Sequence, residues 1–295
     1  MIARLGLLFA LVAGMAQAQD CAAQWNAGFS FAMTRGLATY EVISPGTVSE
    51  TGDWCRVQGV ELFDRRTLGL FVDDARWQAQ GFAPDAEDLS LTVLLDGMRI
   101  VARSGEPWTD HMLALQSLHN PHVGEFSVLW NPLSGDLGGA LRLAQDGGYE
   151  ISVTYQGGGF GQEVLNGDAT AVTVDYKSLS VTNNGTLDGF IFGLMSGRMS
   201  QDPGTPAALF DRARADARGL IDGLPPDLFG YATKGALRDL VADMPVPRGT
   251  LTVTLDPQEP ISLAPFLTLF GNPAPEALVE AAQGAKVQVH YARAR

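Results

Sequence analysis

Hydrophobic and polar residues alternate along many stretches of this chain, most clearly between Leu137 and Val181. There, apolar residues follow one another at every second position over Tyr149, Ile151, Val153 and Tyr155. This spacing is typical of a strand with one buried face. Each end of this region has a turn sequence. Asp146-Gly147-Gly148 precedes the run that starts at Tyr149, and Asn183-Asn184-Gly185 follows the run that ends at Val181. Because Asp-Gly and Asn-Gly pairs tolerate the positive φ of tight turns, we expect antiparallel pairing.

The same alternation predicts further strands on both sides of this region. They cover residues 57–63, 68–72, 75–79, 89–95, 98–102, 123–130, 251–255 and 287–291. Asp96-Gly97 lies between two of these runs and predicts a hairpin turn there.

A helical period replaces the alternation after Leu187. Residues 187–199 place apolar side chains on one side and glycines at every fourth position. Thr205 stands at an N-cap position with Pro206 after it, which predicts a helix that ends near Gly223. Shorter helices are predicted over 21–34, 234–244, 262–270 and 275–283.

These elements predict an α+β fold in which a long curved antiparallel sheet wraps a small cluster of helices. We expect a single β-rich domain over residues 19–295, with a helical insertion at about 187–244. Helices and strands do not alternate regularly, so a parallel βαβ sheet is not expected. The sequence shows no repeat of fixed period.

The first residues have the pattern of a secretory signal peptide, residues 1–18. Arg4 precedes an apolar segment over 5–15, and Ala16-Gln17-Ala18 is a small-x-small cleavage signal. We expect cleavage after Ala18, a periplasmic location, and no stable transmembrane span in the mature chain, because the apolar segment is too short. Lipid attachment at Cys21 is disfavoured, because the residues before it do not fit such a site.

Two cysteines, Cys21 and Cys55, are the only ones in the chain. In an exported protein their simplest interpretation is one disulfide that closes the N-terminal segment. Two unlinked thiols are the alternative.

The chain is acidic, with 33 Asp and Glu residues against 20 Lys and Arg residues and a formal net charge of −13. Nucleic acid and anionic lipid surfaces would repel it, so nucleic acid is not an expected partner. The acidic residues are scattered, which indicates solvating charge more than an acidic binding face.

Metal or hydrolase chemistry has one candidate region, which contains His111, His119 and His122 with Asp110 and Glu125 nearby. Imidazole and carboxylate groups suit Zn²⁺, but Pro121 prevents His119 and His122 from sharing one helical face. Surface histidines are the favoured interpretation. No Gly-x-Ser-x-Gly motif occurs, and the glycine run 157–161 is followed by strand pattern, where a phosphate loop needs a helix. We therefore expect no catalytic residues, no resident metal and no cofactor.

Apolar residues of the helical region are candidates for lining a ligand cavity against the sheet. They are Phe190, Phe192, Leu194, Met195, Phe210 and Leu240. A lipid or another hydrophobic small molecule is the ligand that such a cavity would accept. The alternative is that these residues simply fill the core. A structural envelope protein that acts through a protein partner is a further alternative.

The last third of the chain carries a resemblance to a known group of proteins. Its segments are Leu179-Ser180-Val181-Thr182-Asn183, Gly185-Thr186-Leu187, Pro225-Pro226, the run from Gly249 to Pro257, and Pro260-Ile261-Ser262-Leu263. This pattern resembles exported, β-rich alphaproteobacterial proteins of unknown function whose layout is similar to that of AsmA-like periplasmic proteins. The resemblance implies a periplasmic protein without known catalysis, associated with lipid homeostasis of the outer envelope. We expect this chain to lack the long N-terminal membrane anchor of AsmA-like proteins, and no functional residue carries over.

Overall fold

The computed structural model of the chain describes residues 20–35, 40–64, 68–80, 89–102, 108, 110–112, 121–131, 133–160, 171–185, 205–262, 279–280 and 282–294. The chain divides into two compact units. Unit 1 comprises Met1–Leu133 with Leu137–Asp146, and unit 2 comprises Ser134–Asp136 with Gly147–Arg295. The prediction of a single domain stays a prediction.

Unit 1 is an antiparallel meander with one helix. Its elements are α2 (Cys21–Arg35), β1 (Tyr40–Thr51), β2 (Trp54–Asp64), β3 (Leu68–Gln80), β4 (Leu89–Ala102), β5 (His122–Asn131) and β6 (Asp136–Gln145). These strands lie in the sheet in the order in which the chain makes them. Short connections favour such sequential antiparallel pairing between β1 and β2 and between β2 and β3, whereas a longer segment, 103–121, joins β4 to β5.

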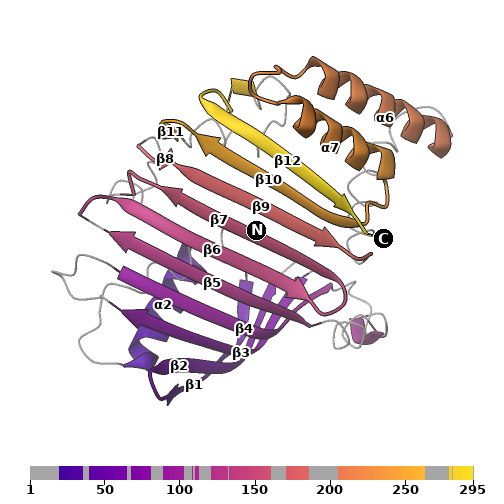
Figure 1. Ribbon diagram of the computed structural model, residues 1–295. Helices are drawn as coiled ribbons and strands as arrows, with labels where there is room; N and C mark the ends of the chain where they lie inside the picture. The colour runs from indigo at the N-terminus through magenta and orange to yellow at the C-terminus, as the bar shows by residue number, and fades with distance from the viewer. Residues whose placement is uncertain are drawn as a thin grey trace. The chain divides into compact units, whose positions relative to one another are not determined.

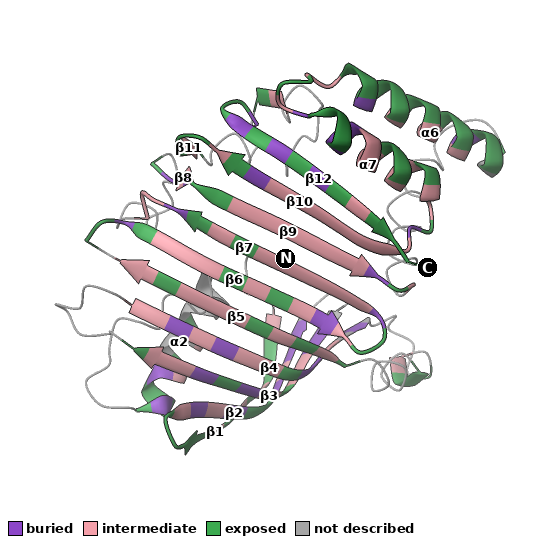
Figure 2. Cartoon of the chain, viewed as in Figure 1, coloured by how far each residue is buried: buried purple, intermediate pink, exposed green. Residues whose placement is uncertain are grey.

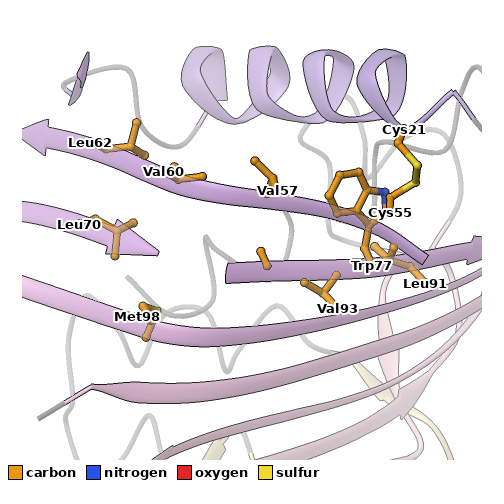
Figure 3. Close-up of a cluster of buried hydrophobic side chains, with 11 residues drawn as sticks. Cys21, Cys55, Val57, Val60, Leu62, Leu70, Trp77, Leu91, Val93 and Met98 are labelled. Atoms are coloured by element: carbon orange, nitrogen blue, oxygen red, sulfur yellow. A yellow bond between two sulfur atoms is a disulfide. The ribbon is translucent and has the colours of Figure 1, made fainter. Parts of the chain in front are cut away.

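The core of unit 1 lies between α2 and the strands β2, β3 and β4 (Figure 3). Cys21 on α2 forms a disulfide with Cys55 on β2, which confirms the predicted bridge. Next to it the rings of Trp25 and Trp77 lie with their centroids 5.8 Å apart. Val57 and Val93 are almost completely buried under the helix. The apolar positions of the predicted alternation thus form this core.

The predicted hairpin at Asp96-Gly97 is wrong, because β4 continues through both residues. The register of β4 shifts against β5 between Leu95 and Met98, as it does at a β-bulge. Gly97 has a φ of +65°, and a Cβ there would lie 2.3 Å from a carboxylate oxygen of Asp73 on β3. Gly97 therefore adopts its positive φ in a bulge and not in a hairpin turn. Strand β3 pairs with β4 on both sides of this bulge.

Strand β1 was not expected from the sequence. It carries Pro45, which has no N–H to donate, and most of its residues are exposed. The strand stands at the end of the sheet order, where proline is tolerated. Its weak alternation reflects this edge position.

Unit 2 combines a second set of antiparallel strands with two helices. Its elements are β7 (Tyr149–Gly157), β8 (Thr173–Val174), β9 (Tyr176–Asn183), α6 (Pro206–Gly223), α7 (Tyr231–Asp243), β10 (Gly249–Pro257), β11 (Ile261–Ser262) and β12 (Ala285–Arg293). The main strands pair in the order β7-β9-β10-β12, while β8 and β11 pair only with each other.

The helices of unit 2 pack as a pair at the β12 side, as Figure 1 shows. Thr205 caps α6 by accepting the Ala208 N–H, and Pro206 opens the helix, both as predicted. Helix α7 begins at Tyr231, earlier than predicted, and packs along β12. The core here includes Phe229, Leu237 and Val287.

Strands dominate the described residues, and the strands paired within each unit are antiparallel, which agrees with the α+β class and the antiparallel prediction. Two local predictions differ. The apolar run that ends at Val181 forms two strands: β8 pairs with β11, and β9 pairs with β7 and β10. Ser262, expected to begin a helix, ends β11, and residues 263–270 lie outside the described residues. The prediction that one curved sheet wraps the helices stays a prediction.

Candidate functional site

The four main strands of unit 2 present one apolar face, which the register defines. Alternate residues of paired strands lie side by side on the same face of a sheet. The apolar face comprises Ile151, Val153 and Tyr155 of β7, Lys177, Leu179 and Val181 of β9, Leu251, Val253 and Leu255 of β10, and Val287, Val289 and Tyr291 of β12. All but Lys177 are apolar or aromatic, and Arg293 continues this face at the end of β12, opposite Gly249.

The β12 side of this face is covered by protein. Leu255, Val287 and Val289 are buried in the core of unit 2, together with Phe229 before α7. Figure 2 shows the consequence on β12, where buried and exposed residues alternate. Burial of this kind is the ordinary role of an apolar sheet face.

The β7 and β9 side is only half covered. Ile151, Val153, Leu179 and Val181 are half-buried, and neither hydrophobic cluster of the described residues includes them. We call these four residues the open patch. Figure 2 shows the intermediate colour along most of β9 and β10. A contiguous apolar patch that the core does not use is a candidate binding surface.

Lys177 stands at one end of the open patch, two residues before Leu179. In the register it lies between Tyr155 on β7 and Leu255 on β10. Burial lowers the pKa of the Lys177 ammonium below its ordinary value. The Lys177 side chain makes no hydrogen bond or ion pair with another residue within the described part of the chain. A partly desolvated cation therefore adjoins an apolar surface without a counterion there.

Tyr155 lies beside Lys177 in the register, and two contacts hold its side chain in place. Its hydroxyl donates to the Thr173 carbonyl at 2.8 Å, and its ring meets Phe160 edge to face at 5.6 Å. Burial, and after it the charge of Asp175, raises the pKa of the Tyr155 hydroxyl. The hydroxyl therefore stays protonated, so the side chain that lies next to Lys177 at this end of the open patch is uncharged.

The opposite face of the same strands is polar. Thr182 and Thr250 bring their hydroxyl oxygens to 2.9 Å, and Ser180 and Thr252 to 3.4 Å. Cross-strand hydroxyl pairs of this kind stabilise a sheet and suit a solvated surface. We therefore expect an apolar ligand to bind the face that carries the open patch.

The cavity predicted from the sequence lies mostly outside the described residues. Phe190, Phe192, Leu194 and Met195 belong to that part of the chain. Phe210 is half-buried on α6 and Leu240 is half-buried on α7. Neither belongs to the core cluster of unit 2, to which α7 contributes Ala236 and Leu237. The predicted cavity stays a prediction.

The histidine region has a different outcome for each residue. His119 lies outside the described residues, and His111 is exposed with its ring centroid 6.2 Å from that of Trp108. His122 opens β5 and places Nδ1 3.1 Å from the Met98 carbonyl oxygen. Within the ranges that the structure describes, no three His, Cys, Asp or Glu residues gather in a way that could hold a metal ion.

The acidic pair Asp73 and Asp74 has basic partners. Asp74 accepts two hydrogen bonds from Arg56, at 2.8 and 2.9 Å, and Asp73 pairs with Arg99. These contacts join β2 to β3 and β3 to β4. Both carboxylates thus take part in cross-strand ion pairs on the sheet.

Sequence reasoning missed the open patch and Lys177. The signal was visible as a lysine in phase with Leu179 and Val181. Alternation alone could not reveal its meaning, because only the register places Tyr155 and Leu255 on either side of it.

Comparisons with known proteins add no family. A scan against protein-family models finds no match for this chain, and a search of curated proteins also finds none. Among the described helices, none combines the length and the apolar character needed to cross a bilayer.

Proposed function

We propose that this protein is a non-catalytic binding protein of the cell envelope that holds a lipid or a similar hydrophobic molecule on the open patch. One observation carries the proposal: half of the apolar face of unit 2 is covered by α7 and the core, while the open patch is not part of any core cluster of the described residues. The part of this half-buried apolar surface that stays in contact with water is costly unless something covers it.

The proposal includes a periplasmic location, and two features of the chain support that part. The N-terminal segment has the pattern of a signal peptide, and the disulfide between Cys21 and Cys55 suits an oxidising compartment. The resemblance to AsmA-like periplasmic proteins agrees with a role near envelope lipids. Acyl chains are unfavourable in the water of such a compartment, and a protein that binds them would shield them from it.

Native mass spectrometry of protein purified gently from the cell envelope tests the proposal. We expect a bound species of lipid mass that is released by organic extraction. Empty protein, or protein that carries a stoichiometric metal ion and no lipid, would overturn it. The second outcome would favour the alternative of a metalloenzyme.

A matched pair of variants locates the site. Val153 belongs to the open patch, whereas its neighbour Thr154 is exposed on the opposite face. Val153→Trp should fill the patch and remove the bound lipid, while Thr154→Trp adds the same ring where no lipid is expected. Circular dichroism and urea unfolding report whether each variant folds.

A milder substitution covers the case in which Val153→Trp does not fold. Leu179→Ser removes apolar area from the patch without adding bulk, and we expect lipid retention about tenfold weaker, the effect of losing most of one leucine's burial. Unchanged retention in a folded Leu179→Ser protein would place the lipid elsewhere and overturn the assignment.

A further inference from the structure

We propose that the molecule on the open patch is an acyl lipid with one negative charge, whose headgroup binds the Lys177 ammonium and whose chain lies along Val153, Leu179 and Val181. This inference rests on the proposed function and deepens it by naming the chemical class of the ligand.

The position of Lys177 carries the inference. Its neighbours across both strands are Tyr155 and Leu255, and Leu179 follows it along the face. These three offer aromatic or aliphatic surface, and the Tyr155 hydroxyl is already bound to the Thr173 carbonyl. The exposed Asp175 precedes Lys177 by two residues and acts on Tyr155, but it makes no ion pair with Lys177. A cation among such neighbours lacks a charged partner within the described residues, and an acidic headgroup would supply one.

The charge balance of the face favours a single negative charge. The other basic residue of this face is Arg293 on β12, and it is neutralised by Asp243 at 2.8 Å and Asp239 at 3.6 Å. Lys177 thus offers one positive charge that forms no ion pair with the described residues, Asp175 included. A carboxylate matches it, while a cationic headgroup would be repelled.

Desolvation strengthens the pairing. Burial lowers the pKa of Lys177, so the charged form is held at a cost that a bound anion would offset. A charge pair in a half-buried site is also stronger than one in bulk water. The same surroundings give the acyl chain a low-dielectric surface next to the headgroup.

The experiment compares three probes of equal chain length: a saturated fatty acid, the corresponding fatty alcohol and the corresponding trimethylammonium surfactant. Binding to the full mature chain is measured below the micelle concentration by calorimetry. We expect the fatty acid to bind about tenfold more tightly than the alcohol, and the cationic surfactant to bind most weakly, as the loss of a charge-assisted contact requires.

Variants assign the preference to Lys177. Lys177→Met should reduce affinity for the acid to that for the alcohol and leave the alcohol unchanged, and Lys177→Arg should keep the preference. Lys286→Met is the matched control, because Lys286 is exposed on the opposite face of β12 and its loss removes the same charge.

The outcomes separate the two proposals. If wild-type protein binds none of the probes, the proposed function fails and this inference fails with it. If the acid and the alcohol bind equally, or if Lys286→Met lowers acid affinity as much as Lys177→Met, the lipid-binding proposal stands and the role of Lys177 is overturned. A Lys177→Met protein that loses both probes equally overturns it as well.

Discussion

Val289 donates its backbone N–H to the Thr233 hydroxyl at 3.1 Å, and the same hydroxyl donates to the Val287 carbonyl at 3.2 Å. Thr233 lies on α7, and β12 is the last strand of the sheet order. An edge strand exposes a row of unpaired backbone groups that invites pairing with other chains. The buried Thr233 hydroxyl thus satisfies two backbone groups of this edge strand, the Val287 C=O and the Val289 N–H. A third group, the Val287 N–H, donates to the Leu228 carbonyl.

Replacing Thr233 by valine tests this closure of the edge. Valine keeps the shape of threonine but leaves a buried N–H and a buried C=O without partners, so we expect a loss of about 1 to 3 kcal/mol in the free energy of unfolding. Urea unfolding measures it. Thr233→Ser keeps the hydroxyl and should lose less. Equal losses in the two variants would assign the effect to packing.

The disulfide is the second expected source of stability. Cys21 and Cys55 are separated by 34 positions, and closing a loop of that length restricts the unfolded chain. Replacing both cysteines by serine should lower the free energy of unfolding by roughly 3 to 4 kcal/mol. Urea unfolding of wild type with and without reductant provides the comparison. A reduced wild type as stable as the oxidised protein would contradict the prediction.

Gln24 and Trp77 form a buried polar contact beside that disulfide. The Trp77 indole N–H donates to the Gln24 side-chain oxygen at 2.9 Å, and both residues are buried. Gln24→Leu should cost about 1 to 3 kcal/mol, because it leaves the indole N–H without an acceptor. The double variant Gln24→Leu with Trp77→Phe removes both partners, so its loss should be smaller than the sum of the single losses. Strict additivity in urea unfolding would show that the contact contributes nothing.

Much of the fold was predictable, because alternation and helix capping act locally. Thr205 and Pro206 fix the start of α6, and Leu89 to Leu95 alternate as a half-buried strand must. Asp96-Gly97 shows the limit of such reasoning. The pair signals a positive φ, but whether that φ makes a turn or a bulge depends on how β4 pairs with β3 and β5, which the local sequence does not reveal.

The candidate site depends more strongly on register than on local pattern. Lys177 is one residue from Ser178, and a shift of one residue in pairing would move it to the polar face. Its partners Tyr155 and Leu255 lie 22 and 78 positions away along the chain, distances that follow from the register pairs Tyr155↔Lys177 and Leu255↔Lys177. The sequence therefore predicts that an apolar face exists, but not which of its residues stay uncovered.

Tyr291 links β12 to the end of α7 and makes the stability of unit 2 depend on pH. Its hydroxyl lies 2.9 Å from a carboxylate oxygen of Asp243 and 2.9 Å from the Arg248 carbonyl oxygen. Burial first, and then the hydrogen bond to Asp243, raises the pKa of Tyr291 from 10.0 to about 12. The folded state thus holds the phenolic proton more tightly than the unfolded state does.

A pKa raised by folding means that the stabilisation is complete below the unfolded pKa of 10.0 and is lost as the pH rises through the folded pKa of about 12. We therefore expect the free energy of unfolding to fall over this window in wild type. Tyr291→Phe should be less stable at neutral pH, where it lacks the hydrogen bonds, yet should lose less stability over the same window. The difference between the two proteins isolates Tyr291 from Tyr155, whose pKa is also raised and which both retain. Urea unfolding at a series of pH values measures it, and parallel curves for the two proteins would refute the assignment.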